Sequence, residues 1–294
     1  MIPFTITGYS TALFATWYFV EELGLLFDAG DGIASALVHK TGKVRQVFLS
    51  HADRDHITGL LQLNQLNARP GIPHICYPAD SGSFPALRDF SFRFDPHVAC
   101  TSWQAVTPQD IVPVGKEYVM QPVRNGHIVA AEDLVKSVSY ILYEQKHKLR
   151  PQFAGLSGRR IAALREETGD EAVMELVREP LLAYSGDSPV EDVERYAGVK
   201  ILIHEATFLE TEALTDPHGR PDRHSALPQV IAMAARLDLK ALILGHFSRR
   251  YSVAEIKDAV QRHCRDYRIA FPVYTVLPGQ LHSDILNEVP CWRP

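Results

Sequence analysis

Two histidines and two aspartates fall within six positions of this chain, directly after an apolar run. In the segment VFLSHADRDHITGL they are His51, Asp53, Asp55 and His56. Imidazole nitrogens and carboxylate oxygens are the protein ligands that zinc, iron and manganese bind. The pattern therefore predicts a metal-binding loop at the end of a strand. The alternative is a polar loop in which Asp53 or Asp55 caps the helix that follows.

Composition indicates an ordinary soluble protein of the cytoplasm. Of the 294 residues 46% are apolar, and the formal net charge of -5 excludes a broad basic surface for nucleic acid, so any RNA binding must be local. The four cysteines lie far apart without a C-x-x-C pair, which predicts reduced thiols. The apolar run ALFATWYFV is too short to cross a membrane and has no basic residue before it, so we interpret it as a strand.

The order of apolar patterns predicts one domain over residues 1–294, with strands early and strand–helix alternation late. ATWYFVEE and LLFDAG are expected to form a hairpin, and QVFLS is expected to be a strand followed by the helix ITGLLQLNQLNA. In the last third KILIHEAT, KALILGHFS and PVYTVLPGQ are expected to be strands, with ALPQVIAMAARLD and VAEIKDAVQRHC as the helices between them.

Residues 144–180 are expected to be a charge-segregated insertion in this pattern. A basic half comes first, followed by a half rich in glutamate and aspartate, and we expect a helical structure from Ser157 onward. The basic half contains six cations: Lys146, Lys148, Arg150, Arg159, Arg160 and Arg165. They either neutralise phosphates of a bound nucleic acid or form a solvated face balanced by the acidic half.

The cluster at residues 51–56 resembles the H-x-H-x-D-H signature of the metallo-β-lactamase superfamily, with Asp53 in place of the second histidine. YSGD (residues 184–187) resembles the superfamily's bridging-aspartate motif, and LLFDAGDG its early strand and acidic turn. Other motifs resemble the ribonuclease Z branch, namely IHEATF (203–208), RHS (223–225) and GHFSRRY (245–251). The resemblance implies an α/β fold, a four-layer αββα sandwich with two metal ions at one sheet edge, and a homodimer.

Carried over residue by residue, the resemblance implies two ligand sets that share one aspartate. The first metal is held by His51, Asp53 and His127, the second by Asp55, His56 and His246, and Asp187 bridges them. His127 is assigned because no other histidine lies between His97 and His147; the alternative is an exposed loop histidine. Asp28 is expected to accept hydrogen bonds near the metal loop rather than bind metal.

Asp53 affects the choice of metal. Two divalent ions are expected, zinc first, but a carboxylate adds negative charge and a hard oxygen, which shifts preference toward manganese or iron. The flavodiiron branch of the superfamily has a glutamate at the matching position, so a carboxylate is compatible with two metals. Three arrangements stay open: two metals with Asp53 as a ligand, one metal at the second site, or a site that has lost metal.

These residues predict a metal-dependent hydrolase. Two metals about 3.5–4 Å apart hold a bridging hydroxide and lower its pKa to near 7. The resemblance makes phosphodiester hydrolysis the leading reaction, with Asp55 at the metal and His224, oriented by Glu205, supplying a proton to the leaving group. His204 is expected to point to the other side of its strand.

The chain departs from the ribonuclease Z branch in two ways. It lacks the basic proline-lysine-arginine-asparagine loop, since the matching place reads GYSTALFATW, and the long arm that holds transfer RNA in bacterial members is not evident. The expected substrate is therefore a phosphodiester, with RNA as one candidate and no membrane partner. The competing hypotheses are a metal-poor pseudoenzyme or binding protein on the same fold, and a di-iron redox protein.

Overall fold

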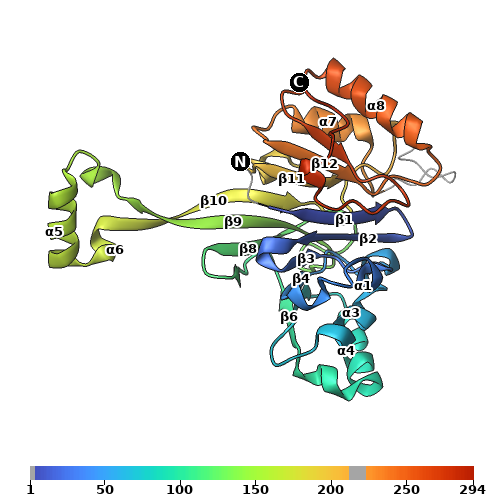
Figure 1. Ribbon diagram of the computed structural model, residues 1–294, viewed down its shortest axis with the longest axis horizontal. Coiled ribbons are helices and arrows are strands. Elements are labelled where there is room, and N and C mark those ends of the chain that lie inside the picture. The colour runs from blue at the N-terminus through green and yellow to red at the C-terminus, as the bar shows by residue number, and fades with distance from the viewer. Residues whose placement is uncertain (1–3, 212–222) are drawn as a thin grey trace.

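Two β-sheets pack face to face, and helices cover the outer face of each sheet (Figure 1). The structure is a computed structural model that describes residues 4–211 and 223–294. Helices α7 (Leu227–Ala234) and α8 (Val253–Asp266) lie on the seven-stranded sheet. Helices α1 (Ile33–Ala36), α3 (Leu60–Asn67) and α4 (Ser83–Phe94) lie below the six-stranded sheet. The four layers are those of an αββα sandwich, so the expected fold class is confirmed.

Both sheets mix antiparallel and parallel pairs. The six-stranded sheet contains, in spatial order, β1 (Ile6–Thr11), β2 (Ala15–Val20), β3 (Leu25–Phe27), β4 (Gln46–Phe48), β5 (His74–Pro78) and β6 (Ser102–Val106). The seven-stranded sheet contains β13 (Val273–Thr275), β12 (Ala241–Gly245), β11 (Ile201–Glu205), β10 (Met174–Tyr184), β9 (Val138–Leu149), β8 (Tyr118–Arg124) and β7 (Val112–Val114). The expected hairpin is β2–β3, which turns at Gly24 with a φ of 58°.

The helices are short, apart from α4, α5 and α8. Their bounds are α1 (Ile33–Ala36), α2 (Arg54–Ile57), α3 (Leu60–Asn67), α4 (Ser83–Phe94), α5 (Gly158–Thr168), α6 (Asp170–Val173), α7 (Leu227–Ala234) and α8 (Val253–Asp266). No helix in residues 4–211 or 223–294 is long and apolar enough to cross a membrane.

Aromatic side chains fill the space between the two sheets. Phe27 and Phe48 come from the six-stranded sheet, and Tyr140 and Tyr184 come from the seven-stranded sheet; all four are buried. The ring centroids of Phe27 and Tyr184 are 5.0 Å apart, and those of Phe48 and Tyr140 are 5.2 Å apart. Aromatic pairs at this separation contribute packing beyond simple burial. They fix how the two sheets face each other, and with them the loops at the sheet edge.

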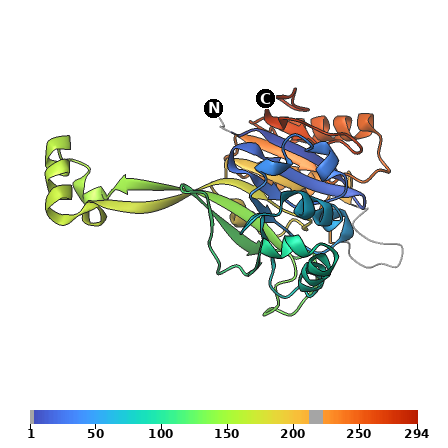
Figure 2. The ribbon, with the colours of Figure 1, turned by 60° about the horizontal axis from the view of Figure 1, so that its bottom comes forward.

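Residues 144–180, which we call the arm, project from the body of the molecule (Figures 1 and 2). Strands β9 and β10 continue as an antiparallel ribbon, with α5 and α6 at its far end. Two expectations are corrected: an arm is present, and the helical structure that begins after Ser157 ends at Val173, where a strand takes over. Most side chains of the ribbon beyond the sheet are polar and at least partly exposed, so the sequence carries no apolar alternation there that would predict strands.

The loop with the histidine–aspartate cluster is held against the turn after β3 by main-chain contacts. Ala29 N donates to His56 O at 2.7 Å, and Gly59 N donates to Ala29 O at 2.8 Å. A Cβ atom on Gly59 would lie 2.2 Å from the carbonyl oxygen of Gly30, which is closer than real Cβ atoms come to any atom. The cluster therefore depends on a glycine for its close approach to the neighbouring turn.

Gly59→Ala is expected to destabilise the protein by about 1–3 kcal/mol, because the added methyl group pushes backbone against backbone. Gly82→Ala is the matched control, since nothing lies within 4 Å of the position its Cβ would take. Thermal unfolding of both variants followed by circular dichroism tests this, and equal melting temperatures would contradict the close packing.

Candidate metal centre

All seven residues expected to bind metal come together at one edge of the two sheets. His51, His127 and Asp187 each lie within three residues of a strand end, and His246 directly follows β12. Asp55 and His56 lie on α2, which begins after Asp53. Because β10, β11 and β12 run parallel, their carboxyl ends meet at the same edge. Ligands distant in the chain thus become neighbours in space.

One group has the arrangement expected for the second metal. Single ligand atoms of Asp55, His56, Asp187 and His246 all lie within 4.8 Å of one another. His246 Nε2 is 3.3 Å from both Asp55 Oδ2 and Asp187 Oδ2, and His56 Nε2 is 3.2 Å from Asp187 Oδ2. All four residues are buried.

A second group shares Asp187. Ligand atoms of His51, His127 and Asp187 also lie within 4.8 Å of one another, and His51 Nε2 is 3.6 Å from Asp187 Oδ2. His127 is buried in this group, so the alternative of an exposed loop histidine is wrong. One carboxylate therefore lies between two sets of imidazoles, as expected of a bridging ligand.

Hydrogen bonds at Nδ1 turn the Nε2 atom of each imidazole toward the cluster. His56 Nδ1 donates to Asp28 Oδ2 at 2.7 Å. His51 Nδ1 lies 2.9 Å from Ser50 Oγ, whose proton goes to Asp28, so the hydroxyl accepts from the ring. His246 Nδ1 lies 2.9 Å from Thr207 Oγ1, and His127 Nδ1 lies 3.4 Å from a main-chain carbonyl. These partners fix the tautomer in which Nε2 carries a lone pair.

Asp28 accepts several of the hydrogen bonds that orient these rings, as expected for a structural carboxylate. Its Oδ1 accepts from Ser50 N at 2.7 Å. Its Oδ2 accepts from Ser50 Oγ, His56 Nδ1 and the hydroxyl of Tyr184, the last at 2.5 Å. Asp28 is buried, with a φ of 53° in the left-handed region that side chains other than glycine rarely adopt. The surrounding contacts hold it there.

The donor set fits divalent cations. Within the described residues, the buried Nε2 atoms of His51 and His56 have no hydrogen-bond partner, and a buried polar atom without one is costly. Burial alone would raise the pKa of Asp187, but His246 and His56 outweigh it and hold that pKa well below its usual value. A buried cluster of carboxylate oxygens and imidazole nitrogens is the donor set that a pair of divalent metal ions requires.

Asp53 lies on the open side of the cluster. Its Oδ2 is 3.4 Å from His127 Nε2 and 3.6 Å from His51 Nε2, and its side chain is 54% exposed. The neighbouring imidazoles of His127 and then His51 hold the pKa of Asp53 far below its usual value. The carboxylate is therefore ionised beside the two imidazoles of the group that contains His127.

Glu205 and His224 form the expected pair next to the cluster. His224 Nδ1 is 3.1 Å from Glu205 Oε1, and these two side chains form a third close group with His246. Burial would raise the pKa of Glu205, but the neighbouring His224 lowers it. His204 is buried outside the three close groups, with its Nδ1 2.7 Å from the carbonyl oxygen of Glu205.

Three orienting residues were not foreseen from the sequence: Ser50, Thr207 and Tyr184. Thr207 Oγ1 donates to Glu205 Oε2 at 2.5 Å and lies 2.9 Å from His246 Nδ1, so it links the carboxylate partner of His224 to a candidate metal ligand. Their only signal was position: each lies inside, or next to, a motif that contains a ligand or catalytic residue.

Comparison with known proteins gives the family. Residues 25–247 match the model of the beta-lactamase superfamily domain. The chloroplastic tRNase Z TRZ2 of Arabidopsis thaliana is 30% identical over 272 residues, which cover 87% of this chain and 71% of that protein.

Solved structures agree with this assignment. The metallo-beta-lactamase fold protein YhfI from Bacillus subtilis has a TM-score of 0.63 at 15% identity, and the short form of human tRNase Z has a TM-score of 0.59 at 18% identity. Each similarity covers 95% of this chain and 99% of the other. This chain therefore belongs to the metallo-β-lactamase superfamily, in its ribonuclease Z-like branch.

Proposed function

We propose that this protein is a metal-dependent phosphodiesterase that cleaves RNA in the manner of ribonuclease Z. The main support is the position of Asp187, which is shared by the two groups of ligands next to the Glu205–His224 pair. The relatives named tRNase Z indicate the class of substrate.

The residues divide into two ligand sets with one shared member. We propose that His51, Asp53 and His127 bind one ion, that Asp55, His56 and His246 bind the other, and that Asp187 binds both. Two divalent cations, when bound there, lower the pKa of water and stabilise negative charge on phosphoryl oxygens. Asp55 has a further contact, since its Oδ2 accepts from Leu13 N at 2.9 Å, which fixes the carboxylate from outside the cluster.

His224 is the proposed proton donor to the leaving group. Its Nδ1–H donates to Glu205, so Nε2 is the atom from which a proton passes to a leaving oxygen. Glu205 is itself fixed, because Oε1 also accepts from Ser188 N at 2.9 Å. A buried, oriented carboxylate stabilises the protonated imidazole and thus keeps the acid form available.

Exposed arginines around the cluster give the local positive charge that RNA requires. Arg54 lies between two proposed ligands in the chain, Arg223 carries the main-chain carbonyl next to His127 Nδ1, and Arg249 lies shortly after His246. On the arm, Lys146 and Lys148 pair with Glu179, and Arg165 pairs with Asp170. Arg159 and Arg160 lie exposed at the start of α5, and we propose that they contact RNA phosphates away from the cleavage point.

The identity of the metal stays a prediction, with zinc first and manganese or iron favoured by Asp53. A cytoplasmic location and a homodimer also stay predictions. The metal-poor pseudoenzyme and the di-iron redox protein are the competing functions. Metal content separates the pseudoenzyme from the hydrolase, and iron together with an oxygen-sensitive optical spectrum would identify the redox protein.

The protein purified without added metal is expected to contain two divalent ions per chain. Asp53→Ala is expected to lose one ion, because only one ligand set includes Asp53, whereas Asp187→Ala is expected to lose both ions along with the cleavage of bis(p-nitrophenyl) phosphate. Inductively coupled plasma mass spectrometry measures the content, with the exposed His39→Ala as the control. Equal metal content in Asp53→Ala and the unaltered protein would remove Asp53 from the ligand set.

His224→Ala is expected to slow the cleavage of RNA by about 10²–10⁴-fold, as general acids do. The same substitution should slow the cleavage of bis(p-nitrophenyl) phosphate much less, because p-nitrophenolate leaves without taking up a proton. Steady-state kinetics on both substrates checks this, with metal content measured in parallel. An equal loss on both substrates would show that His224 acts on the metal centre instead.

Arg159→Ala with Arg160→Ala is expected to weaken RNA binding and to reduce the dependence of log K on log salt by about 0.7 per lost phosphate contact. Lys146→Ala with Lys148→Ala is the matched control, since these cations are already paired with Glu179. Fluorescence anisotropy between low and moderate salt gives both slopes. Identical slopes for the two double variants would mean that the arginines form only a solvated face.

A further inference from the structure

The turn between β1 and β2 exposes two apolar side chains at the edge of the metal centre. Leu13 is 86% exposed and Phe14 is 52% exposed. Leu13 also has a φ of 68°, a left-handed conformation that costs free energy in a residue with a branched apolar side chain. An exposed and strained apolar turn has no stabilising role of its own, which points to a contact with a ligand.

Hydrogen bonds fix this turn directly against the metal ligands. Leu13 N donates to Asp55 Oδ2 at 2.9 Å, and Phe14 N donates to Thr11 O at 3.0 Å. Ala12 N donates to the carbonyl oxygen of Phe247, which follows His246 in the chain. Phe14 is therefore the neighbour in the chain of Leu13, whose main-chain amide donates to the proposed ligand Asp55.

A cation lies over the ring. The guanidinium carbon of Arg249 is 5.5 Å from the centroid of the Phe14 ring, a distance typical of a cation–π contact. Arg249 is exposed and comes from the loop after β12, so it approaches the turn from the other sheet. The aromatic ring of Phe14 and the positive charge of Arg249 therefore contact each other next to the candidate metal centre.

A cavity of about 360 Å³ adjoins the ring, within the size range of small-molecule sites. Its lining residues are mostly aromatic or apolar and include Tyr9, Phe14, Trp17, Asp31 and Leu281. Within the described residues, the buried indole Nε1 of Trp17 has no hydrogen-bond partner. Asp31 is exposed and offers carboxylate oxygens to an amino group of a ligand.

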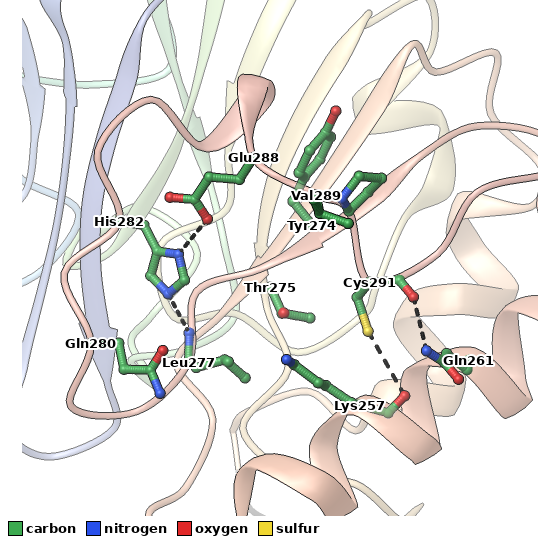
Figure 3. Close-up of a pocket in the computed structure, with 11 residues that line it drawn as sticks. Lys257, Gln261, Tyr274, Thr275, Leu277, Gln280, His282, Glu288, Val289 and Cys291 are labelled. Carbon is green, nitrogen blue, oxygen red and sulfur yellow. Dashed lines mark hydrogen bonds and ion pairs between the residues drawn. The ribbon is translucent and has the colours of Figure 1, made fainter.

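Leu281 is held in place by the next residue, His282, which Figure 3 shows with its hydrogen-bond partners Glu288 and Leu277. His282 Nδ1 donates to Glu288 Oε2 at 2.7 Å, and its Nε2 accepts from Leu277 N at 3.2 Å. The main chain of His282 also pairs with Gly8 of β1 through two hydrogen bonds of 2.9 and 3.0 Å. The cavity beside Phe14 is therefore formed in advance rather than by a loose loop.

We propose that Phe14 is the stacking surface for an unpaired nucleobase of the nucleotide next to the scissile phosphate. The cavity takes the base, Asp31 accepts from a ring N–H or an exocyclic amino group of the base, and Arg249 neutralises an adjacent phosphate. Base–aromatic stacking accounts for about five- to hundredfold in affinity per base and tolerates any sequence. This inference rests on the proposed phosphodiesterase function and adds a determinant of substrate choice.

Three chromogenic phosphodiesters test it with the metal-loaded protein. Methyl p-nitrophenyl phosphate carries no base, whereas the 5′- and 3′-(p-nitrophenyl phosphate) esters of thymidine carry a base on either side of the phosphate. We expect the unaltered protein to favour one thymidine ester over the methyl ester in kcat/KM. Phe14→Ala should reduce that ratio about five- to hundredfold, and Phe14→Trp should preserve it.

Phe90→Ala is the matched control, because Phe90 is equally exposed (52%) but lies on α4, stacked on Phe94. It should leave all three rates unchanged. A ratio that stays within twofold in Phe14→Ala for both thymidine esters overturns the stacking role. If the unaltered protein hydrolyses none of the three esters, the phosphodiesterase function itself fails, so the two failures are distinguishable.

Discussion

The buried carboxylate of Asp28 holds the metal centre in its geometry. Asp28 lies after β3 of one sheet and accepts a hydrogen bond from the hydroxyl of Tyr184 in the other sheet. A single side chain therefore joins the two halves of the sandwich. The same group fixes Ser50 and the ring of His56. Because these contacts come from residues outside the cluster, the fold itself orients the proposed ligands. Preorganisation of this kind lowers the cost of binding two like charges side by side.

Most of the sheet architecture, and the gathering of the proposed ligands at one sheet edge, could be predicted from the sequence. Apolar runs predicted β2, β4, β11 and β12, and the dense H-x-D-x-D-H pattern indicated the loop that contains the first candidate ligands. Asp187, His224 and His246 needed the resemblance to known motifs, since a single aspartate or histidine after a strand is common. His127 carried the weakest signal, because its strand pairs antiparallel and its loop contains no other ligand.

The remaining features depend on tertiary contacts that leave little trace in the sequence. The ribbon of the arm is largely exposed, so its strands show no alternation of apolar and polar residues. Thr207 and Ser50 orient imidazoles through hydroxyl groups, which are too frequent in loops to stand out. The contact between the Phe14 ring and the Arg249 guanidinium could not be predicted from the sequence. It forms only because the fold brings the β1–β2 turn and the loop after β12 together.

The open position of Asp53 has an evolutionary consequence. The buried ligands are locked by neighbours from both sheets, so exchange of any one of them leaves a cavity or an unpaired charge. The side chain of Asp53 is half in solvent, and it makes no hydrogen bond that caps the helix after it. An aspartate codon differs from a histidine codon by one nucleotide. Under the proposed ligand assignment, a single substitution at this solvent-facing position therefore changes the ligand set, while the interior stays as it is.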